Sequence, residues 1–285
     1  MRRGLLTAAV LAAVLACATT TDAAAPRRLA AFSGTGSWVS IYDTHALRHP
    51  GQVIATLRAH RIHTLFLETS NDRQRHDVTH PVAIARLLDA AHDAGIAVVG
   101  WYLPSFTHPR REVARALAGA RFRSPAGNGF SAFALDIEST AIRALRVRSA
   151  RAVEVARGVR AGLPRATALG AITIDPAGGR YWNGYPFAQL ARSVDVFLPM
   201  EYFTYRTHGV RRVAAYSTAN VRLVRRLAGD PRFPVQPIGG DALTATMPAL
   251  RAFLRASNAS GTLGVSLWEY GGTRPREWAA LESAR

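Results

Sequence analysis

The chain has 285 residues and a formal net charge of +17, and all 36 of its basic residues are arginines. The arginines are spread along the expected helices and do not alternate with aromatic residues on one strand, so we expect no nucleic-acid binding. Attraction to anionic wall polymers or lipid head groups is a more natural use of this charge. Because the chain has a single cysteine, an internal disulfide is excluded.

The first residues have the composition of an export segment. Two arginines precede an apolar run from Leu5 to Ala16, which is too short to span a bilayer as a permanent helix. We therefore predict a signal peptide over residues 1–17 and an exported protein, extracellular or lipid-anchored to the outer face of the cytoplasmic membrane. Cys17 directly follows Val14-Leu15-Ala16, which resembles the lipobox at which bacterial lipoproteins are cleaved and acylated. Ordinary cleavage after Ala23-Ala24-Ala25 is the alternative, and both remain open.

The rest of the chain predicts one linker and one domain. Residues 18–32 begin with a stretch of mostly Ala and Thr that lacks apolar periodicity, which indicates a flexible linker. In residues 33–285, short apolar runs alternate with helical stretches, the pattern of βα units around a parallel sheet. Eight alternations predict a single α/β domain, a (β/α)8 barrel, and we expect a monomer. The expected strands are 38–43, 64–69, 96–103, 131–138, 168–174, 194–202, 233–238 and 263–268, and the clearest helices are 51–60, 82–94, 111–120, 149–161 and 247–257.

The ends of the expected strands carry mostly acidic and aromatic side chains. In a barrel of this kind, the reaction site is built at the carboxyl ends of the strands. Carboxylates supply acid and base groups, aromatic faces stack against sugar rings, and acids gathered at one end of a barrel are costly unless they have a function. These strand ends hold Tyr42 and Asp43, Glu68, Trp101 and Tyr102, Asp136 and Glu138, Asp175, Glu201 and Tyr202, and Trp268 to Tyr270.

The fourth expected strand gives the sharpest signal. Side chains alternate along a strand with a period of two, so Asp136 and Glu138 share a face with Ala132 and Ala134. Both acids then point into the mouth of the barrel. Two close carboxylates do not ionise independently, and one of them is pushed towards the neutral form that protonates a leaving oxygen. Pairing of these acids with the abundant arginines is the structural alternative.

These motifs resemble a known family of enzymes. A D-x-E at the end of the fourth strand, an M-x-Y at the end of the sixth and a tryptophan at the end of the eighth are similar to family 18 chitinases, and here they are Asp136-x-Glu138, Met200-x-Tyr202 and Trp268. The resemblance implies that Glu138 is the general acid and that Asp136 orients the N-acetyl group of the substrate as it attacks the anomeric carbon. It also implies that Tyr202 supports that group and that Trp268 is the platform under the sugar.

Two further resemblances support a sugar-cleaving barrel. Leu135 to Glu138 resembles the corresponding strand of family 25 lysozymes, and residues 185–202 are similar to uncharacterised bacterial hydrolase-like barrels. Together the resemblances imply a glycoside hydrolase that cleaves glycosidic bonds in an extracellular or cell-wall polysaccharide, with an amino-sugar polymer as the favoured substrate. Such a reaction needs no cofactor.

Other residues at the strand ends are expected to bind the substrate. Glu68 shares a face with Thr64 and Phe66 and so reaches the mouth of the barrel, whereas Glu201 lies on the opposite face from Tyr202. The histidines form no pattern typical of a metal site, so we expect no metal. The full set of expected substrate-binding residues is Trp268, Glu68, Glu201, Tyr102, Asp175 and Asp43.

Two other functions remain open. The chitinase motif has a further aspartate where this chain has Ala134, so the chain is alternatively a non-catalytic carbohydrate-binding barrel, anchored as a lipoprotein. In the third interpretation, Glu68 or Glu201 is the nucleophile of a conventional two-carboxylate retaining mechanism. A separation of about 5 Å between its carboxyl group and that of Glu138 would favour this mechanism.

Overall fold

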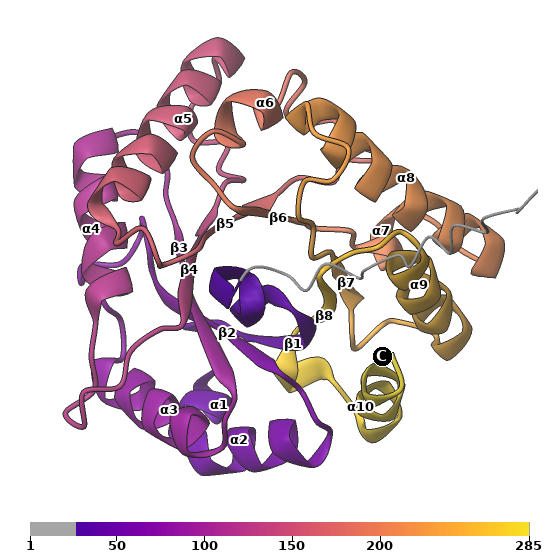
Figure 1. The fold of residues 1–285 in the computed structure, drawn as a ribbon, viewed down its shortest axis with the longest axis horizontal. Helices are drawn as coiled ribbons and strands as arrows, with labels where there is room; N and C mark the ends of the chain where they lie inside the picture. Colours follow the sequence, from indigo (N-terminus) through magenta and orange to yellow (C-terminus); the bar gives the residue numbers. More distant parts are fainter. Residues whose placement is uncertain (1–26, 285) are drawn as a thin grey trace, which may run out of the picture.

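The computed structural model describes residues 27–284, which form a barrel of eight parallel strands surrounded by helices (Figure 1). Neighbouring strands follow the order β6-β5-β4-β3-β2-β1-β8-β7. Two parallel bridges, Phe197 to Val235 and Met200 to Ile238, join β6 to the segment that contains β7 and close the ring. The predicted (β/α)8 barrel is therefore confirmed.

Six of the eight strands lie within or close to the predicted ranges, and two are displaced along the chain. The first expected strand, residues 38–43, is in fact residues 34–39, and the seventh, expected at 233–238, begins only at Ile238. Both predictions were wrong because the glycine-rich runs of these strands hide the apolar alternation that marks a strand. The strands are β1 (Gly34–Val39), β2 (Thr64–Asn71), β3 (Ala97–Leu103), β4 (Ala132–Asp136), β5 (Leu169–Thr173), β6 (Val196–Pro199), β7 (Ile238–Asp241) and β8 (Gly264–Trp268).

A helix or pair of helices follows each strand and covers the outside of the barrel (Figure 1). The helices expected from the sequence occur within a few residues of their predicted limits. Several begin with a proline in the first turn, where the missing backbone N–H is not needed. The helices are α1 (Thr44–Arg48), α2 (Pro50–Ala59), α3 (Pro81–Asp93), α4 (Pro109–Arg121), α5 (Leu145–Gly162), α6 (Phe187–Leu190), α7 (Phe203–Arg206), α8 (Val210–Ala228), α9 (Met247–Ala259), η2 (Tyr270–Gly272) and α10 (Pro275–Glu282).

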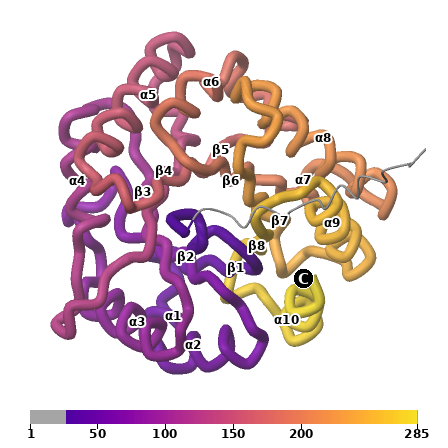
Figure 2. Tube along the Cα trace, viewed as in Figure 1, coloured from indigo at the N-terminus to yellow at the C-terminus, as the bar shows by residue number. Residues whose placement is uncertain are grey.

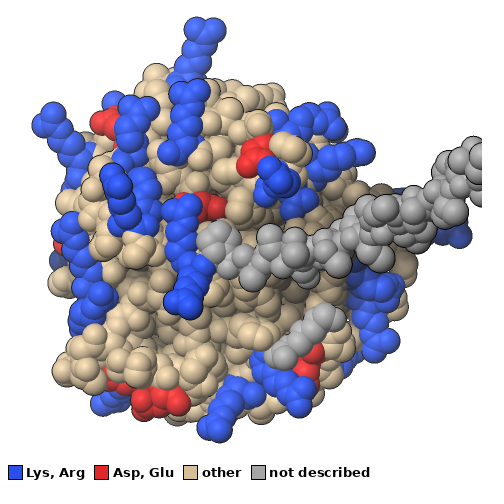
Figure 3. Space-filling view, viewed as in Figure 1, with Lys and Arg blue, Asp and Glu red and all other residues tan. Residues whose placement is uncertain are grey.

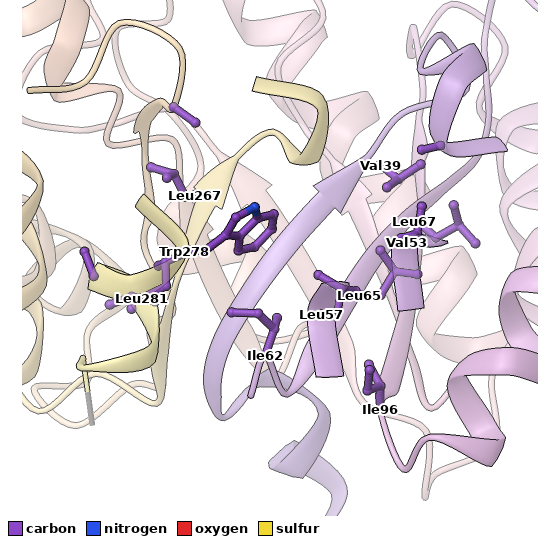
Figure 4. Packing of buried hydrophobic residues seen from close by; sticks show 14 of the residues in the cluster. Val39, Val53, Leu57, Ile62, Leu65, Leu67, Ile96, Leu267, Trp278 and Leu281 are labelled. Carbon is purple, nitrogen blue, oxygen red and sulfur yellow. The ribbon is translucent and has the colours of Figure 1, made fainter. Parts of the chain in front are cut away.

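Alternate residues of each strand bury against this helix layer. On β2, Leu65 and Leu67 pack towards α2, whose Val53 and Leu57 face them, and all four side chains are buried (Figure 4). On β8, Leu267 contacts the same cluster, which Trp278 of α10 completes. Removing so many large apolar side chains from water is the main favourable contribution to folding of the barrel.

The other face of each strand fills the barrel interior, and the short helix η1 (Arg27–Phe32) covers its amino-terminal end. The backbone of Gly34 bonds to Leu263, the residue before β8, and the carbonyl of Ala31 accepts from Thr64 at the start of β2. Phe32 is fully buried, and η1 lies in the middle of the ring of strands (Figure 2). The fold thus already includes Arg27 to Phe32, residues expected to belong to the linker, because their apolar side chains seal the barrel.

The predicted export segment, with Cys17 and the alternative cleavage site, lies outside the described residues. Within residues 27–284, no helix has the length and apolar character needed to cross a membrane. On the face of the molecule that carries η1, arginine side chains project on all sides and are separated by uncharged surface (Figure 3). The arginines of this face are thus dispersed rather than gathered over one element.

Candidate active site

A cavity of about 960 Å³ opens where the strands end at their carboxyl side. Its wall combines acids and aromatic rings from five neighbouring strands with the residues that follow them. The shape follows from the alternation on each strand, because large side chains in one strand lie beside small ones in the next, such as Trp101 beside Ala134. The lining residues are Trp38, Ser40, Tyr42, Glu68, Asn71, Asp72, Arg73, Trp101, Leu103, Asp136, Glu138, Ser139, Thr140, Ala141, Ile172, Tyr181, Met200, Tyr202, Ile238, Trp268 and Glu269.

Three tryptophans form the floor of this cavity. The ring centroids of Trp38 and Trp101 are 5.9 Å apart, and Trp268 lies 6.0 Å from Trp38 and 6.3 Å from Trp101. Trp268 was expected at this place, whereas Trp38 and Trp101 were not among the expected site residues. The signal for Trp101 was available in part, since the neighbouring fourth strand has the small residues Ala132 and Ala134 on its inward face before Asp136 and so leaves room for a large ring.

Asp136 and Glu138 both line the cavity, as the alternation of β4 predicted. Asp136 is 7% exposed, and its Oδ1 has no hydrogen-bond partner among the described residues. Burial raises the pKa of Asp136 well above its usual value, with further contributions from the negative charges of Glu138 and Glu68. Burial also raises the pKa of Glu138. Both carboxyls therefore keep a proton to higher pH than an ordinary acid does, which suits the pair to proton transfer.

Glu68 supplies a third carboxyl to the same cavity. It is 2% exposed, and its oxygens accept hydrogen bonds from the backbone N–H of Ile41 and the side chain of Asn71, each at 3.0 Å. Burial raises its pKa to about 7, although both hydrogen bonds oppose the increase. The amide of Asn71 also donates to the hydroxyl of Tyr42, 2.9 Å away. Glu68 is thus held in one orientation and is partly protonated at neutral pH.

Glu269 completes the acidic part of the wall, although it directly follows Trp268 and an unbroken alternation would place it on the opposite face. The strand ends at Trp268 and the chain turns into η2, so the alternation does not extend to Glu269. Burial and the charge of Asp43 raise the pKa of Glu269. Tyr202 and Tyr181 lie near Asp136 and Glu138, and burial followed by these negative charges raises the pKa of both phenols. Both tyrosines therefore remain protonated and able to donate a hydrogen bond.

None of the four carboxyls Glu68, Asp136, Glu138 and Glu269 forms an ion pair with an arginine among the described residues. The abundance of arginine made such pairs the main structural explanation for Asp136 and Glu138. Buried acids without a counter-ion are costly, and they gather where a protein needs perturbed pKa values. The cavity is therefore the best candidate for an active site in the described part of the chain.

Tyr102 was expected at the site but faces the helix layer. Its hydroxyl donates to Glu112 of α4 at 2.7 Å, and the guanidinium of Arg115 lies 5.6 Å from the ring centroid. Adjacent residues of a strand point to opposite faces, and Trp101, not Tyr102, belongs to the inward face of β3. The aromatic residue of this strand that lines the cavity is therefore Trp101, one residue before the predicted Tyr102.

Three expected substrate-binding acids also lie outside the cavity. Asp175 turns away after the end of β5 and pairs with Arg206 of α7 at 3.1 Å. Glu201 is fully buried and lies against Ser217 of α8, with burial raising its pKa. Asp43 caps α1 by accepting a hydrogen bond from the backbone of Ala46 at 2.9 Å, because β1 ends earlier than expected. None of the three lines the cavity. A loop orients Asp175 and a helix cap orients Asp43, whereas Glu201 points away from Tyr202, as the alternation along the strand predicted.

The site offers acids but no ready metal centre. No group of three or more His, Cys, Asp or Glu within residues 27–284 is arranged to hold a metal ion. The acids lie instead at separate points along the cavity wall.

Comparisons with known proteins give a fold but no family. No protein-family model matches the chain. No curated protein matches its sequence. Among solved structures, the chain resembles an endo-beta-1,4-mannanase from Thermotoga petrophila with a TM-score of 0.65, 10% identity, and coverage of 89% of this chain and 76% of that one.

Two other similar structures act on amino sugars or cell walls by name. A glycoside hydrolase family 18 N-acetylglucosaminidase from Paenibacillus barengoltzii has a TM-score of 0.61 and 14% identity, over 89% of this chain and 100% of that one. The spore cortex-lytic enzyme of Bacillus cereus has a TM-score of 0.63 and 10% identity, over 87% and 73%. At such low identities the likeness establishes a fold shared with glycoside hydrolase barrels.

Proposed function

We propose that the protein is an exported glycoside hydrolase that cleaves glycosidic bonds in an extracellular or cell-wall polysaccharide. The observation that carries the proposal is the pair Asp136 and Glu138, which lies without arginine partners in an aromatic cavity at the carboxyl ends of the strands. The shared fold with glycoside hydrolase barrels, among them a family 18 enzyme, supports the same reaction class. The export segment supports a substrate outside the cytoplasm.

Glu138 is the proposed general acid. Burial raises its pKa and so favours the protonated form, which donates its proton to the glycosidic oxygen as the bond to the anomeric carbon breaks. The resulting carboxylate then takes a proton from the attacking water, which restores the acid. Removal of a general acid typically lowers the rate by about 10²- to 10⁴-fold.

Asp136 is proposed to act on the substrate rather than on the leaving group. Its Oδ1 is buried and lacks a partner among the described residues, so it can accept a hydrogen bond from the N–H of an acetamide. This contact orients the acetamide oxygen for attack on the anomeric carbon, and the phenol of Tyr202 supports that group. The three tryptophans form the surface on which the sugar ring stacks.

An amino-sugar polymer is the proposed substrate. The acetamide provides the internal nucleophile, so the reaction retains the anomeric configuration without an enzyme nucleophile, a recognised exception to the two-carboxylate scheme. The N-acetylglucosaminidase and the cortex-lytic enzyme that share the fold favour this polymer class. Glu68 is the remaining candidate for a conventional nucleophile, since Glu201 does not line the cavity.

The proposal is tested by hydrolysis of soluble oligosaccharides and purified cell wall. The mature protein and its Glu138→Gln variant are compared at equal folded concentration, with Glu154→Gln on the exposed face of α5 as a control that removes one carboxylate elsewhere. We expect cleavage by the unmodified protein and by the control, and a loss of about 100-fold or more in Glu138→Gln. Equal activity of the two variants would remove Glu138 from the mechanism.

The same experiment separates an enzyme from a carbohydrate-binding barrel. If neither protein cleaves any substrate while an oligosaccharide still raises the melting temperature, the barrel binds sugars without turnover.

A further inference from the structure

The acids and tryptophans of the cavity are arranged in a row across neighbouring strands. In the order of the sheet, β4 contributes Asp136, β3 contributes Trp101, β2 contributes Glu68 and β1 contributes Trp38. The row continues on β8 and the residue after it, with Trp268 and Glu269. Carboxyls and aromatic rings thus share one wall. The proposed reaction uses Asp136 and the tryptophans of this wall but not Glu68 and Glu269.

The Glu68 and Glu269 end of the row is acidic and lacks a counter-ion among the described residues. The charge of Glu269 contributes to the raised pKa of Glu68, so the two carboxyls interact across the cavity wall. The one basic residue among those that line the cavity is Arg73, which is exposed at the rim and forms no ion pair with either acid. The buried Oε2 of Glu269 has no hydrogen-bond partner among the described residues.

Unsatisfied groups in the same wall indicate that a ligand completes it. Asp136, at 7% exposed, has an unpartnered Oδ1, and the indole N–H groups of Trp38 and Trp101 are also buried without partners among the described residues. Leaving buried polar atoms unpaired is costly, so such atoms usually meet a bound molecule. A neutral sugar can accept hydrogen bonds from the indole N–H groups, but it brings no positive charge to balance the carboxyls.

We propose that the Glu68 and Glu269 end of the cavity binds the ammonium group of a sugar with a free amine, so that the substrate is a partly de-N-acetylated amino-sugar polymer. The inference rests on the proposed function and specifies its substrate. The sugar that is cleaved keeps its acetamide at Asp136, and a neighbouring sugar places its ammonium between Glu68 and Glu269. Tryptophan faces in the same row attract a cation as well as a sugar ring.

The charge distribution favours an organic cation over other occupants. No three acids of the described chain are placed to coordinate one metal ion, whereas an ammonium needs only two or three acceptors at separate points. The remaining surface is strongly basic, so a cationic group is attracted only where the acids gather. An ammonium in this position also stabilises the charged forms of the acids, so binding releases protons.

Calorimetry with three hexasaccharides of the same β-1,4 linkage tests the inference. The ligands are a hexamer of glucosamine, its fully N-acetylated counterpart and the glucose hexamer, in which a hydroxyl replaces each amine. The protein is the Glu138→Gln variant, so that ligands are bound without cleavage. The measurement is made at about pH 6, below the pKa of Glu68, in two buffers with different ionisation enthalpies.

The free-amine hexamer is expected to bind about tenfold or more tightly than the glucose hexamer, with release of protons. Adding Glu68→Gln or Glu269→Gln should remove most of this preference, whereas adding Glu154→Gln, the same charge change on the exposed face of α5, should leave it unchanged. The proton release comes from groups that face the bound amine. They are the carboxyls of Glu68, Glu269, Asp136 and Asp72. The guanidinium of Arg73 and the phenols of Tyr42, Tyr181 and Tyr202 also line the cavity.

The outcomes separate the inference from the proposed function. If all three hexamers bind equally, or the N-acetylated hexamer binds most tightly without proton release, the ammonium site is overturned while a glycoside hydrolase remains. If Glu154→Gln weakens the preference as much as the cavity variants do, the preference reflects net charge and the site is again overturned. If no hexamer binds, both the inference and an amino-sugar substrate are wrong. Melting temperatures of all variants show whether each is folded.

Discussion

Two sets of buried carboxyls in this barrel are treated in opposite ways. In the helix layer, Asp175 pairs with Arg206, and Glu277 of α10 pairs with Arg274 and Arg276 at 3.0 and 2.8 Å. Burial acts to raise the pKa of Glu277, but the hydrogen bonds from these arginines lower it overall. In the cavity, the four acids have no arginine partner among the described residues, and their pKa values are raised.

The difference shows what an arginine-rich chain does with its positive charge. The chain has almost twice as many arginines as acids, 36 against 19, and two helix-layer acids, Asp175 and Glu277, pair with arginines. Glu112 and Glu201 are also buried in that layer but form no such pair among the described residues. Burying a charge without a partner costs several kcal/mol, on the order of the net stability of a domain. Acids that lack an arginine and also line an open cavity are therefore the ones for which a function has to be sought.

The largest effect that tests the comparison is the loss of activity in Glu138→Gln. We expect a decrease in kcat/KM of about 100-fold or more, because the amide has no proton to give to the leaving oxygen. Stability should change little, since the variant removes a carboxyl without an arginine partner. Hydrolysis rates and melting temperatures measured on one preparation check both parts. A strong loss of stability instead would mean that Glu138 belongs with the structural acids.

The second effect is the pH dependence of stability due to Glu68. Burial raises its pKa from 4.5 to about 7, so the folded protein holds this proton more tightly than the unfolded chain. The contribution is fully present below pH 4.5 and is lost as the pH rises through about 7. Over that window we expect the free energy of unfolding to fall by roughly 3 kcal/mol on account of Glu68.

Glu68→Gln removes this titration and should flatten the corresponding part of the stability curve. Denaturant unfolding at a series of pH values measures it in both proteins. For a paired acid of the helix layer the sign is reversed, so Glu277→Gln should cost most stability at neutral pH and least at low pH, because the pKa of Glu277 is lowered. Identical pH profiles for the two variants would contradict the distinction between the two sets.

A smaller effect is expected when the helix-layer pair is broken. Arg206→Ala leaves Asp175 buried with Tyr216 as its remaining side-chain partner and should lower the free energy of unfolding by about 2 kcal/mol. Arg206→Lys keeps the charge and should recover part of the loss. Because the pair lies outside the cavity, the KM of the folded enzyme should not change. An altered KM with unchanged stability would place Asp175 in the substrate site after all.

The smallest effect is expected for Tyr102→Phe. The hydroxyl of Tyr102 bonds to the buried carboxyl of Glu112, so its removal should cost about 1 kcal/mol of stability. Activity should stay within about twofold of the unmodified protein, since the ring faces α4 and not the cavity. The matched control is Trp101→Phe on the preceding residue, which faces the cavity. It should weaken oligosaccharide binding more than Tyr102→Phe does.

The prediction of the site succeeded where strand alternation extends unbroken to the side chain in question. Asp136, Glu68 and Trp268 lie within their strands, so the period of two placed them in the cavity. Tyr202 also lines the cavity, although β6 ends at Pro199. The prediction failed for Tyr102, because adjacent residues of a strand point to opposite faces and Trp101 is the one that faces the cavity. It failed for Glu269 as well, because η2 begins directly after the strand.

The sequence by itself determined the eight βα units and the inward face of β4, because apolar periodicity and strand alternation are local properties of the chain. Only the tertiary structure decided which acids meet an arginine. Arg206 and Asp175 lie on different βα units and come together only after the barrel closes, and the same closure leaves Glu68, Asp136, Glu138 and Glu269 around one cavity without such partners. Their pKa values follow from that burial and proximity, which no local pattern records.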